Sequence, residues 1–344
     1  MKKIIFIDDG IEFDSLTRLD QPTGGAENAF ISLVESLARK GFNISVFNNC
    51  RNVGKINGVN WYRLEKSIFD QKFDIIVINR GDKFLNFKKE CKKRIFWIHN
   101  PANYLMKFRY LSKLFLNPAT IVFSGSHHFR TYPNWAPSKQ KEIIPYGVED
   151  FIFNSRENLK NIKPVAIFTS NPLRGLEWLL DIWVKEIFPA VPEATLKLFT
   201  GMQTYGKHGE KKNILAYPIL DRAKNLKHKG VILKHPLPRN QLIKEIKQSR
   251  IFLYKGSFDE TFCMSVAESQ VLGIPSVVKD LGCMRERVIH GKTGFVAGSD
   301  QEFSSYAIKL LTEDKSWLNM HKYMLKNNTH FSWDKIAEMW KKIL

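Results

Sequence analysis

The chain has 344 residues, of which 44% are hydrophobic and 25% charged, and its formal net charge is +19. This composition is typical of a globular protein with a large core and excludes a disordered chain. No run of 18 or more apolar residues occurs, so we expect no membrane-spanning helix. The length indicates two domains of ordinary size.

The four cysteines are scattered without a CxxC pair, and the nine histidines show no metal-ligand spacing. These features indicate a reducing, cytoplasmic setting without a disulfide framework or a zinc site. The positive charge indicates an anionic partner, such as nucleic acid, acidic lipid or a phosphorylated small molecule. Alternatively, it reflects only a chain rich in Lys, Asn, Ile and Phe. Basic and aromatic residues are interleaved in 83–113.

Apolar runs alternate with amphipathic segments over the first 150 residues. The runs predict buried strands at 4–7, 43–47, 73–79, 94–99, 119–124 and 142–148. An apolar stripe at helical spacing over 26–41, followed by Gly41, predicts a helix. The first apolar run is interpreted as a strand and not as a signal peptide, because Asp8 and Asp9 end it after four residues.

A polar stretch at 151–163 is interpreted as a linker, after which the pattern restarts. Strands are predicted at 165–170, 194–201, 230–236, 250–256 and 275–278, and helices from about 175, at about 239–248, within 263–272 and at the end of the chain. Continuous apolar strands that alternate with helices indicate parallel sheets covered on both faces. The sequence therefore predicts two doubly wound α/β domains, 1–150 and 164–331, with a cleft between their strand ends.

Three features of the sequence could bind anions or do chemistry at those strand ends. Gly24 and Gly25 open the first helix, which indicates either an anion site or an ordinary glycine turn. His99 ends a predicted strand, where it could belong to a site or be a structural residue. Arg174 precedes the first helix of the second domain, where it could bind a diphosphate or lie on the surface.

Two glutamates eight positions apart, Glu260 and Glu268, bracket an apolar segment. Glu260 is expected in the loop after a strand, at the predicted cleft. For Glu268 two interpretations stay open. The sequence SVAE at 265–268 fits a capping box, in which Glu268 only satisfies a backbone N–H. If the helix begins at 262 or 263, Glu268 falls in its second turn and is available to a ligand.

The segment SFDETFCMSVAESQVLGIPSVV resembles the E-x7-E signature of the family 4 glycosyltransferases, which have the GT-B fold. Five further segments resemble that family in the same order: GGAEN, IPYGVEDFIF, RGLEWLL, RERVIHGKTGFVA and FSWDKIAEMW. The resemblance spans nearly the whole chain. It implies two Rossmann-like domains facing each other across a cleft, the first on the acceptor side and the second binding the donor. It also implies that a final helix at about 332–344 joins the first domain.

The resemblance implies a retaining, metal-independent transfer of a sugar from a nucleotide sugar, with UDP- or GDP-sugars favoured over ADP-sugars. It implies that Glu260 hydrogen-bonds hydroxyls of the donor sugar and that Glu268 binds hydroxyls of the ribose. Arg174 would balance the diphosphate charge, and Ser170 would lie in the same donor site. His99 resembles the family histidine near the donor sugar.

The resemblance also implies backbone contacts to the donor. Gly24 and Gly25 would approach the diphosphate, and N–H groups around Phe262, Cys263 and Met264 would meet the phosphates or sugar. No metal or other cofactor is expected. A second basic residue is usual in the family about five positions before Arg174, where this chain has Thr169. Lys207 and Lys255 are candidate substitutes.

The expected acceptor is a glycan, a lipid-linked sugar or another hydroxyl compound. The stretch 83–113 could rest on anionic membrane, which would make the protein peripheral there. A nucleotide-sugar epimerase or a glycosyl phosphorylase of the same fold is an alternative. A non-catalytic polyanion-binding protein is another, although no nucleic acid is expected because no RNA- or DNA-binding motif occurs.

Overall fold

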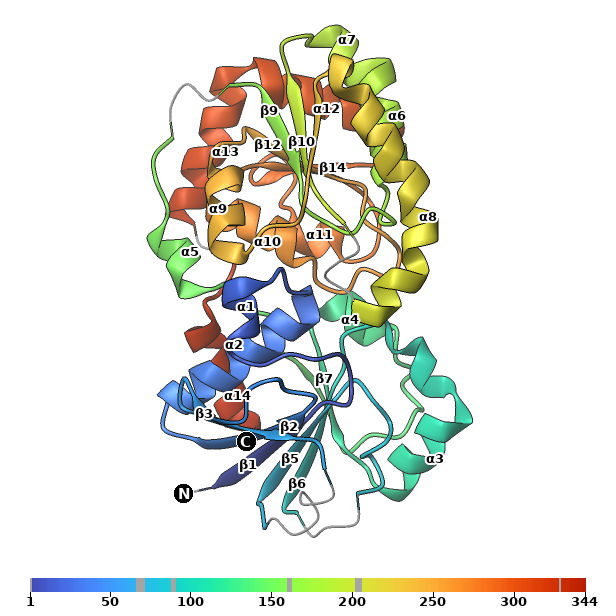
Figure 1. The fold of residues 1–344 in the computed structure, drawn as a ribbon, viewed down its shortest axis with the longest axis vertical. Helices are drawn as coiled ribbons and strands as arrows, with labels where there is room; N and C mark the ends of the chain where they lie inside the picture. The colour runs from blue at the N-terminus through green and yellow to red at the C-terminus, as the bar shows by residue number, and fades with distance from the viewer. Residues whose placement is uncertain (1, 66–71, 88–90, 160–162, 202–205, 328) are drawn as a thin grey trace. The chain divides into compact units, whose positions relative to one another are not determined.

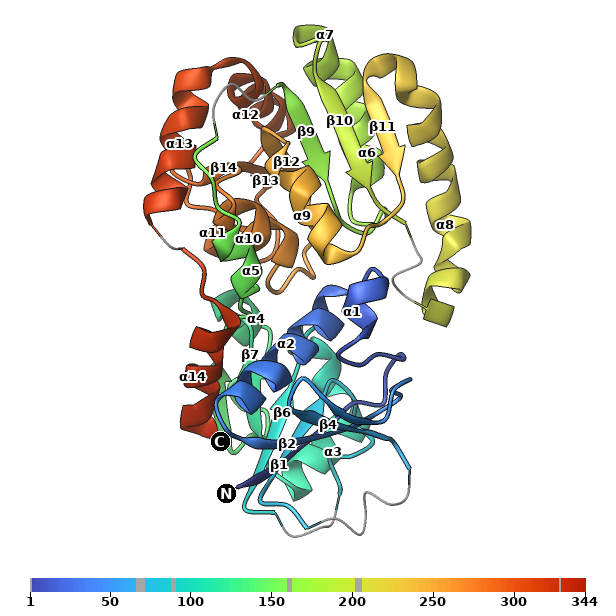
Figure 2. The same ribbon diagram turned by 60° about the vertical axis from the view of Figure 1, so that its left-hand side comes forward.

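The computed structural model describes residues 2–65, 72–87, 91–159, 163–201, 206–327 and 329–344. The chain forms two compact units, shown in Figures 1 and 2. The first unit comprises Met1–Arg18, Gly25–Gly147 and Ser332–Leu344, and the second comprises Leu19–Gly24 and Val148–Phe331. The boundary thus falls at 147 where the sequence placed it at 150. The first four residues of the predicted linker, 151–154, belong instead to a short helix, α5 (Asp150–Asn154), in which Ile152 is buried.

The first unit is built on an eight-stranded sheet in the order β3-β4-β2-β1-β5-β6-β7-β8. Every pairing is parallel except that of β3 with β4. The strands are β1 (Lys3–Ile7), β2 (Asn43–Asn48), β3 (Gly54–Ile56), β4 (Val59–Arg63), β5 (Ile75–Asn79), β6 (Lys93–Trp97), β7 (Thr120–Phe123) and β8 (Gln140–Ile143).

The β3–β4 hairpin is absent from the sequence prediction, although the sequence carries a signal for it. Asn57 and Gly58 form its two-residue loop, and both have positive φ, at 49° and 82°. Asn-Gly favours a two-residue hairpin turn because both residues tolerate the left-handed region. The strands are short and half of their residues are exposed, so they lack the apolar run by which the other strands were found.

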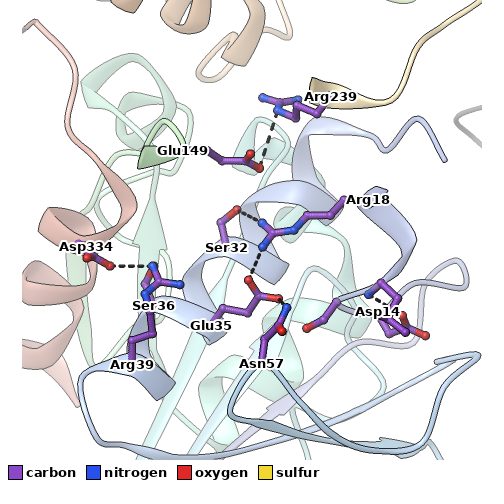
Figure 3. Close-up of polar contacts among 12 residues, drawn as sticks. Asp14, Arg18, Ser32, Glu35, Ser36, Arg39, Asn57, Glu149, Arg239 and Asp334 are labelled. Atoms are coloured by element: carbon purple, nitrogen blue, oxygen red, sulfur yellow. Dashed lines mark hydrogen bonds and ion pairs between the residues drawn. The ribbon is translucent and has the colours of Figure 1, made fainter. Parts of the chain in front are cut away.

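Helices cover both faces of the first sheet, and the alternation of side chains along β1 shows how. Phe6 packs against Phe30 of α2 (Gly25–Arg39) and Trp340 of α14 (Trp333–Ile343). Ile5 and Ile7 point the other way, into the cluster that includes buried residues of α3 (Phe108–Leu116). At the surface, Arg39 of α2 binds Asp334 of α14 at 2.8 Å (Figure 3). The remaining helical segments are α1 (Thr17–Asp20), η2 (Ala102–Met106) and α4 (Ser126–Arg130).

The second unit is built on a six-stranded, wholly parallel sheet in the order β11-β10-β9-β12-β13-β14. The strands are β9 (Val165–Phe168), β10 (Thr195–Phe199), β11 (Val231–Lys234), β12 (Ile251–Tyr254), β13 (Ser276–Lys279) and β14 (Gly294–Ala297). The helices are α6 (Leu176–Ile182), η3 (Trp183–Ile187), α7 (Phe188–Ala190), α8 (Gly206–Asn225), η5 (Leu226–Lys229), α9 (Arg239–Lys247), α10 (Met264–Val271), α11 (Met284–Arg287), α12 (Asp300–Thr312) and α13 (Asp314–Lys326).

Helix α8 and strand β14 are among the elements of the second unit that are absent from the sequence prediction. Helix α8 contains Pro218 in its interior, which interrupts the helical pattern because proline lacks an N–H donor. Strand β14 is only four residues long, too short for a clear apolar run. In the residues that the structure describes, no helix is both long and apolar enough to cross a membrane.

Each sheet has one point at which the strand order reverses. In the first sheet it lies between β1 and β5, and in the second between β9 and β12. Ligands of doubly wound sheets bind beyond the carboxyl ends of the strands at such a point. The residues that follow these four strands are therefore the candidates for function. The predicted fold class, two doubly wound α/β domains, is confirmed.

Candidate functional site

The start of α10 in the second unit decides between the two interpretations of Glu268. The helix begins at Met264, and Cys263 before it is in the left-handed conformation, without a side-chain cap hydrogen bond. Ser265 is thus already within the first turn, and Glu268 lies in the second. A capping box needs its serine just outside the helix. The capping-box interpretation is therefore wrong for this pair.

Glu268 is instead part of a buried ion pair. Its side chain pairs with the guanidinium of Arg239, the first residue of α9. The Nε of Arg239 also lies 3.8 Å from Oε1 of Glu149, toward which it points in Figure 3. Glu268 and Glu149 are both buried. A buried carboxylate requires a cation or several donors. Arg239 supplies that cation, and no sequence motif linked it to Glu268.

Glu260 is also buried and also held by an arginine. Its Oε2 accepts a hydrogen bond from Nη1 of Arg174 and another from the Tyr254 hydroxyl at 2.7 Å. Glu260 follows β12, and Arg174 lies in the turn that precedes α6. These side chains therefore meet beyond the carboxyl ends of β9 and β12, at the reversal of the second sheet. The sequence predicted Glu260 and Arg174 here but missed Tyr254.

Burial and charge fix the protonation of the groups around Glu260. Burial alone would lower the pKa of Arg174, but the carboxylate of Glu260 and the hydroxyl of Tyr254 raise it above its ordinary value. Burial, together with the charge of Glu260, raises the pKa of Tyr254 well above 10. The same two causes raise the pKa of the Cys263 thiol to about 12. At neutral pH the arginine is charged and both the phenol and the thiol keep their protons.

The loop that carries Glu260 is pinned by close backbone contacts. The N–H of Cys283 donates to the carbonyl of Glu260 at 3.1 Å. Gly282 has φ of 56°, and a Cβ there would lie 2.8 Å from that carbonyl oxygen, so only glycine fits. The guanidinium of Arg287 stacks over the ring of Phe262 at 4.3 Å. Phe262, Cys263 and Met264 are all buried, at the amino end of α10.

The other predicted donor residues of this unit lie around β9. The Ser170 hydroxyl is 3.4 Å from the Tyr254 hydroxyl, and the Ser170 carbonyl accepts from Thr200. Lys255 directly follows Tyr254, and its ammonium lies 5.4 Å from the centre of the Trp178 ring. Whether Lys255 replaces the basic residue missing at Thr169 stays a prediction. The side chain of Lys207 lies outside the described residues.

The first unit carries a second polar cluster at its own reversal. The Tyr146 hydroxyl bonds Nδ1 of His99, and Nε2 of His99 lies 2.6 Å from Oδ1 of Asn79. The amide of Asn79 in turn donates to Asp8. Because Oδ1 of Asn79 can only accept, Nε2 of His99 carries the proton and Nδ1 accepts from Tyr146. The chain of hydrogen bonds therefore runs in one direction from Tyr146 to Asp8.

An arginine completes this cluster. Arg80 follows β5 with φ of 51°, and it binds Asp8 through Nε at 2.9 Å and Glu27 through Nη1 at 2.7 Å. Glu27 lies in the first turn of α2, whose first residue is Gly25. Neither Gly24 nor Gly25 has a positive φ. The sequence predicted Gly24, Gly25 and His99 but missed Asp8, Asn79, Arg80 and Tyr146.

Two histidines of the first unit are held neutral. Burial, helped by the nearby charge of Arg80, lowers the pKa of His99 well below 6.5. Burial lowers the pKa of His128 to about 4. Nε2 of His128 donates to the Asn100 carbonyl at 2.8 Å, which holds the segment after β6. His99 is therefore a neutral group at physiological pH, bonded at both nitrogens, and it does not supply a proton.

Among the described residues, no group of three or more His, Cys, Asp or Glu side chains is arranged to hold a metal ion. The charged groups that follow strands of the second unit include the two arginine–glutamate pairs. A cation next to carboxylates at such a point can bind a phosphorylated ligand that also carries hydroxyl groups, because arginine binds phosphate and carboxylate accepts from hydroxyls.

Comparison with known proteins gives one family match. Residues 211–330 match the family model described as "Glycosyl transferases group 1". This range contains Tyr254, Glu260, Glu268 and Arg239. No curated protein matches the chain by sequence.

Solved structures match the chain over its whole length. Sucrose-phosphate synthase from Thermosynechococcus elongatus has 14% identity and a TM-score of 0.75, covering 100% of this chain and 98% of its own. HepE from Anabaena, in complex with UDP and glucose, has 13% identity and a TM-score of 0.73, covering 100% and 99%. A TarM variant from S. aureus, in complex with Fondaparinux, alpha-GlcNAc-glycerol and UDP, has 10% identity and a TM-score of 0.73, covering 100% and 99%.

These matches establish the GT-B fold for this chain. Together with the group 1 family match inside the second unit, they make the chain an enzyme of the glycosyltransferase type.

Proposed function

We propose that this enzyme transfers a sugar from a nucleoside diphosphate sugar to a hydroxyl acceptor, with retention of anomeric configuration. We also propose that the transfer needs no metal. The observation that carries this proposal is the pair of buried carboxylates, Glu260 and Glu268, eight positions apart at the amino end of α10. Each is paired with an arginine, and Glu260 lies at the reversal point of the second sheet. The spacing fits the E-x7-E signature of family 4, to which we assign the chain.

The proposed roles in the second unit follow from charge. Breaking the bond between sugar and diphosphate builds negative charge on the departing diphosphate. Without a metal, that charge is met by Arg174 and by the N–H groups at the amino end of α10, around Phe262, Cys263 and Met264. Glu260 accepts hydrogen bonds from the sugar hydroxyls and Glu268 from the ribose hydroxyls. Lys255 is proposed as the second cation.

His99, Gly24 and Gly25 keep in this proposal the roles that the family resemblance implies. His99 is proposed to lie near the donor sugar as a neutral ring, because burial and the charge of Arg80 oppose its protonation. Gly24 and Gly25 are assigned a backbone approach to the diphosphate at the start of α2. His99→Asn should then lower turnover more than it lowers the affinity for UDP. Steady-state kinetics would measure the first and calorimetry the second.

UDP is the first nucleotide to test. HepE and TarM are solved in complex with UDP, which supports a UDP-sugar here, with a GDP-sugar next and an ADP-sugar last. Thermal shift with UDP, GDP, ADP and a polyanion should show stabilisation by one nucleotide. Stabilisation by the polyanion alone would instead favour the non-catalytic alternative and overturn the proposal.

The donor is then found by a hydrolysis screen over sugars of the stabilising nucleotide, and the acceptor by a second screen with that donor. Interconversion of the donor sugar without release of nucleotide would identify an epimerase. Release of a sugar phosphate that depends on inorganic phosphate would identify a phosphorylase. Transfer to a glycan or a lipid-linked acceptor is the expected result.

Helix α3 supports contact with an anionic membrane by the first unit. Phe108, Phe115 and Leu116 are 84%, 76% and 70% exposed, and Lys107 beside them is also exposed. Exposed aromatic side chains next to cations are typical of helices that lie on acidic lipid. We expect the protein to pellet with vesicles that contain acidic lipid and not with neutral ones.

The doubly substituted protein Phe108→Ser, Phe115→Ser should lose this binding. Tyr217→Ser in α8, which removes a 68% exposed ring from the second unit, is the matched control and should keep it. Equal pelleting of both variants, or no dependence on acidic lipid, would count against a membrane role for α3.

A further inference from the structure

Among the residues that the structure describes, two hydrogen bonds hold the Glu260 carboxylate. The Tyr254 hydroxyl and Nη1 of Arg174 both donate to Oε2. Neither bond uses Oε1, so the capacity of that oxygen to accept hydrogen bonds is left to other donors. A carboxylate fixed in this way presents one oxygen in a constant direction.

The two donors to Glu260 differ in how firmly they are held. The Tyr254 side chain is 1% exposed at the end of β12, and its ring packs against Phe168 and Phe252 at centroid distances of 6.0 and 6.1 Å. The side chain of Arg174 is 40% exposed and long. A buried aromatic ring loses little freedom by bonding, whereas a partly exposed arginine can change partners.

The Tyr254 hydroxyl is also oriented from its other side. The Ser170 hydroxyl lies 3.4 Å away, after the neighbouring strand β9. If Ser170 donates to Tyr254, the phenol proton is directed to Glu260. Burial and the charge of Glu260 raise the pKa of Tyr254, so the phenol keeps this proton throughout the neutral range.

We propose that Tyr254 is a positioning residue, which holds Oε2 of Glu260 so that Oε1 meets the donor sugar. This inference rests on the proposed function. When a diphosphate binds, it competes with Glu260 for Arg174, because both are anions that arginine binds. Tyr254 is then the donor that remains on Glu260. Tyr254 should therefore affect recognition of the sugar and not of the nucleotide.

The test is Tyr254→Phe, which removes the hydroxyl and keeps the ring. Calorimetry with UDP and with UDP-glucose gives the gain in affinity that the sugar adds. In the variant, UDP affinity should stay within about twofold of the wild type, while the gain from the sugar falls about tenfold. Ser170→Ala, at a less buried position, should change the gain in the same direction by about twofold.

Tyr132→Phe is the matched control. The Tyr132 hydroxyl is also buried and donates to the Pro137 carbonyl at 2.7 Å, but it lies in the first unit. This variant should bind both ligands as the wild type does. A double-mutant cycle separates positioning from a general structural effect, because Tyr254→Phe should change nothing further in a Glu260→Gln protein.

The outcomes distinguish this inference from the proposed function. If the wild type binds none of UDP, GDP and ADP, the proposed function and the inference both fall. If another nucleotide is selected, its sugar replaces UDP-glucose in the same test. If the wild type gains affinity from the sugar and Tyr254→Phe keeps that gain, the inference alone is overturned.

Discussion

The two sheets reverse their strand order in the same way, but the polar clusters at the two reversal points differ in how far their side chains are buried. In the first unit, Asp8, Asn79 and His99 form a continuous chain of hydrogen bonds that ends at Tyr146. In the second unit, Glu260 is bonded from one side by Arg174, whose side chain is 40% exposed. All side chains of the hydrogen-bonded chain in the first cluster are buried, and we call that cluster closed. The second is called open, because Arg174 bonds Glu260 directly and is more exposed than Arg80 in the first. The strand order decides where a polar cluster can lie, and the loops decide whether it can exchange partners with a ligand.

A shared backbone feature links the two clusters. Arg80 in the first unit and Cys263 in the second are non-glycine residues with positive φ, at 51° and 63°. A side chain in this region strains the backbone, and such strain persists only where the surroundings impose it. Arg80 is held by Asp8 and Glu27, whereas Cys263 is held by the packing at the start of α10.

The largest effect is expected from breaking the closed cluster. Asp8→Asn leaves Arg80 and Asn79 with an amide in place of a buried carboxylate, and should lower the free energy of unfolding by about 4 kcal/mol. Urea unfolding measures the change. Asp334→Asn, which weakens a half-exposed pair with Arg39, is the control and should cost at most about 1 kcal/mol. Similar losses in both variants would contradict a special role for the Asp8 cluster.

The open cluster should respond in activity. Glu260→Gln keeps the shape of the side chain but removes the charge that Arg174 and Tyr254 bind. Turnover of the donor should fall about 100-fold, equivalent to about 2.7 kcal/mol, with little change in nucleotide affinity. Glu157→Gln, at a 60% exposed glutamate of the same unit, is the control.

Glu268→Ala should instead weaken nucleotide binding. If Glu260→Gln and Glu268→Ala lost stability equally and showed no separate effects on turnover and nucleotide binding, the proposed roles of both residues in donor binding would be wrong.

Both units should lose stability in mild acid. Burial lowers the pKa of His128 in the first unit to about 4 and that of His330 in the second to about 3. The unfolded chain therefore binds more protons below about pH 6.5, and stability falls as the pH falls. Each of these two histidines should lower the free energy of unfolding by about 2 kcal/mol between about pH 7 and pH 5.

Urea unfolding at a series of pH values measures this loss. His128→Gln and His330→Gln should each flatten the pH dependence, whereas His228→Gln, at an exposed ring, should not. A pH dependence that stays the same in both buried variants would be evidence that these histidines are not the groups that titrate.

The smallest effect concerns the strained residue at α10. Cys263→Gly should be more stable than Cys263→Ala by about 1 kcal/mol, because alanine keeps the strain and glycine does not. The order should be reversed at Ser305, an exposed position within α12, where glycine is less stable than alanine. Thermal unfolding of the four variants would compare them. An alanine at 263 as stable as glycine would mean that the left-handed conformation costs little.

Much of the fold follows from local pattern. Buried strands such as β5 and β12 are continuous apolar runs, because parallel strands are covered on both faces. Elements without such a run were missed, among them the β3–β4 hairpin, the proline-containing α8 and the four-residue β14. Their signals were a turn dipeptide or a weak periodicity, which a search for apolar runs does not detect.

The sequence by itself determined the alternation of strands and helices, and it placed Glu260 and Arg174 after strands of one sheet. It left open where α10 begins, and therefore what Glu268 does. Only the tertiary structure paired Glu268 with Arg239 and Glu260 with Tyr254, and assembled Asp8, Asn79 and His99. The physical reason is that local pattern reports burial along one segment, whereas the partner of a buried charge comes from a distant part of the chain.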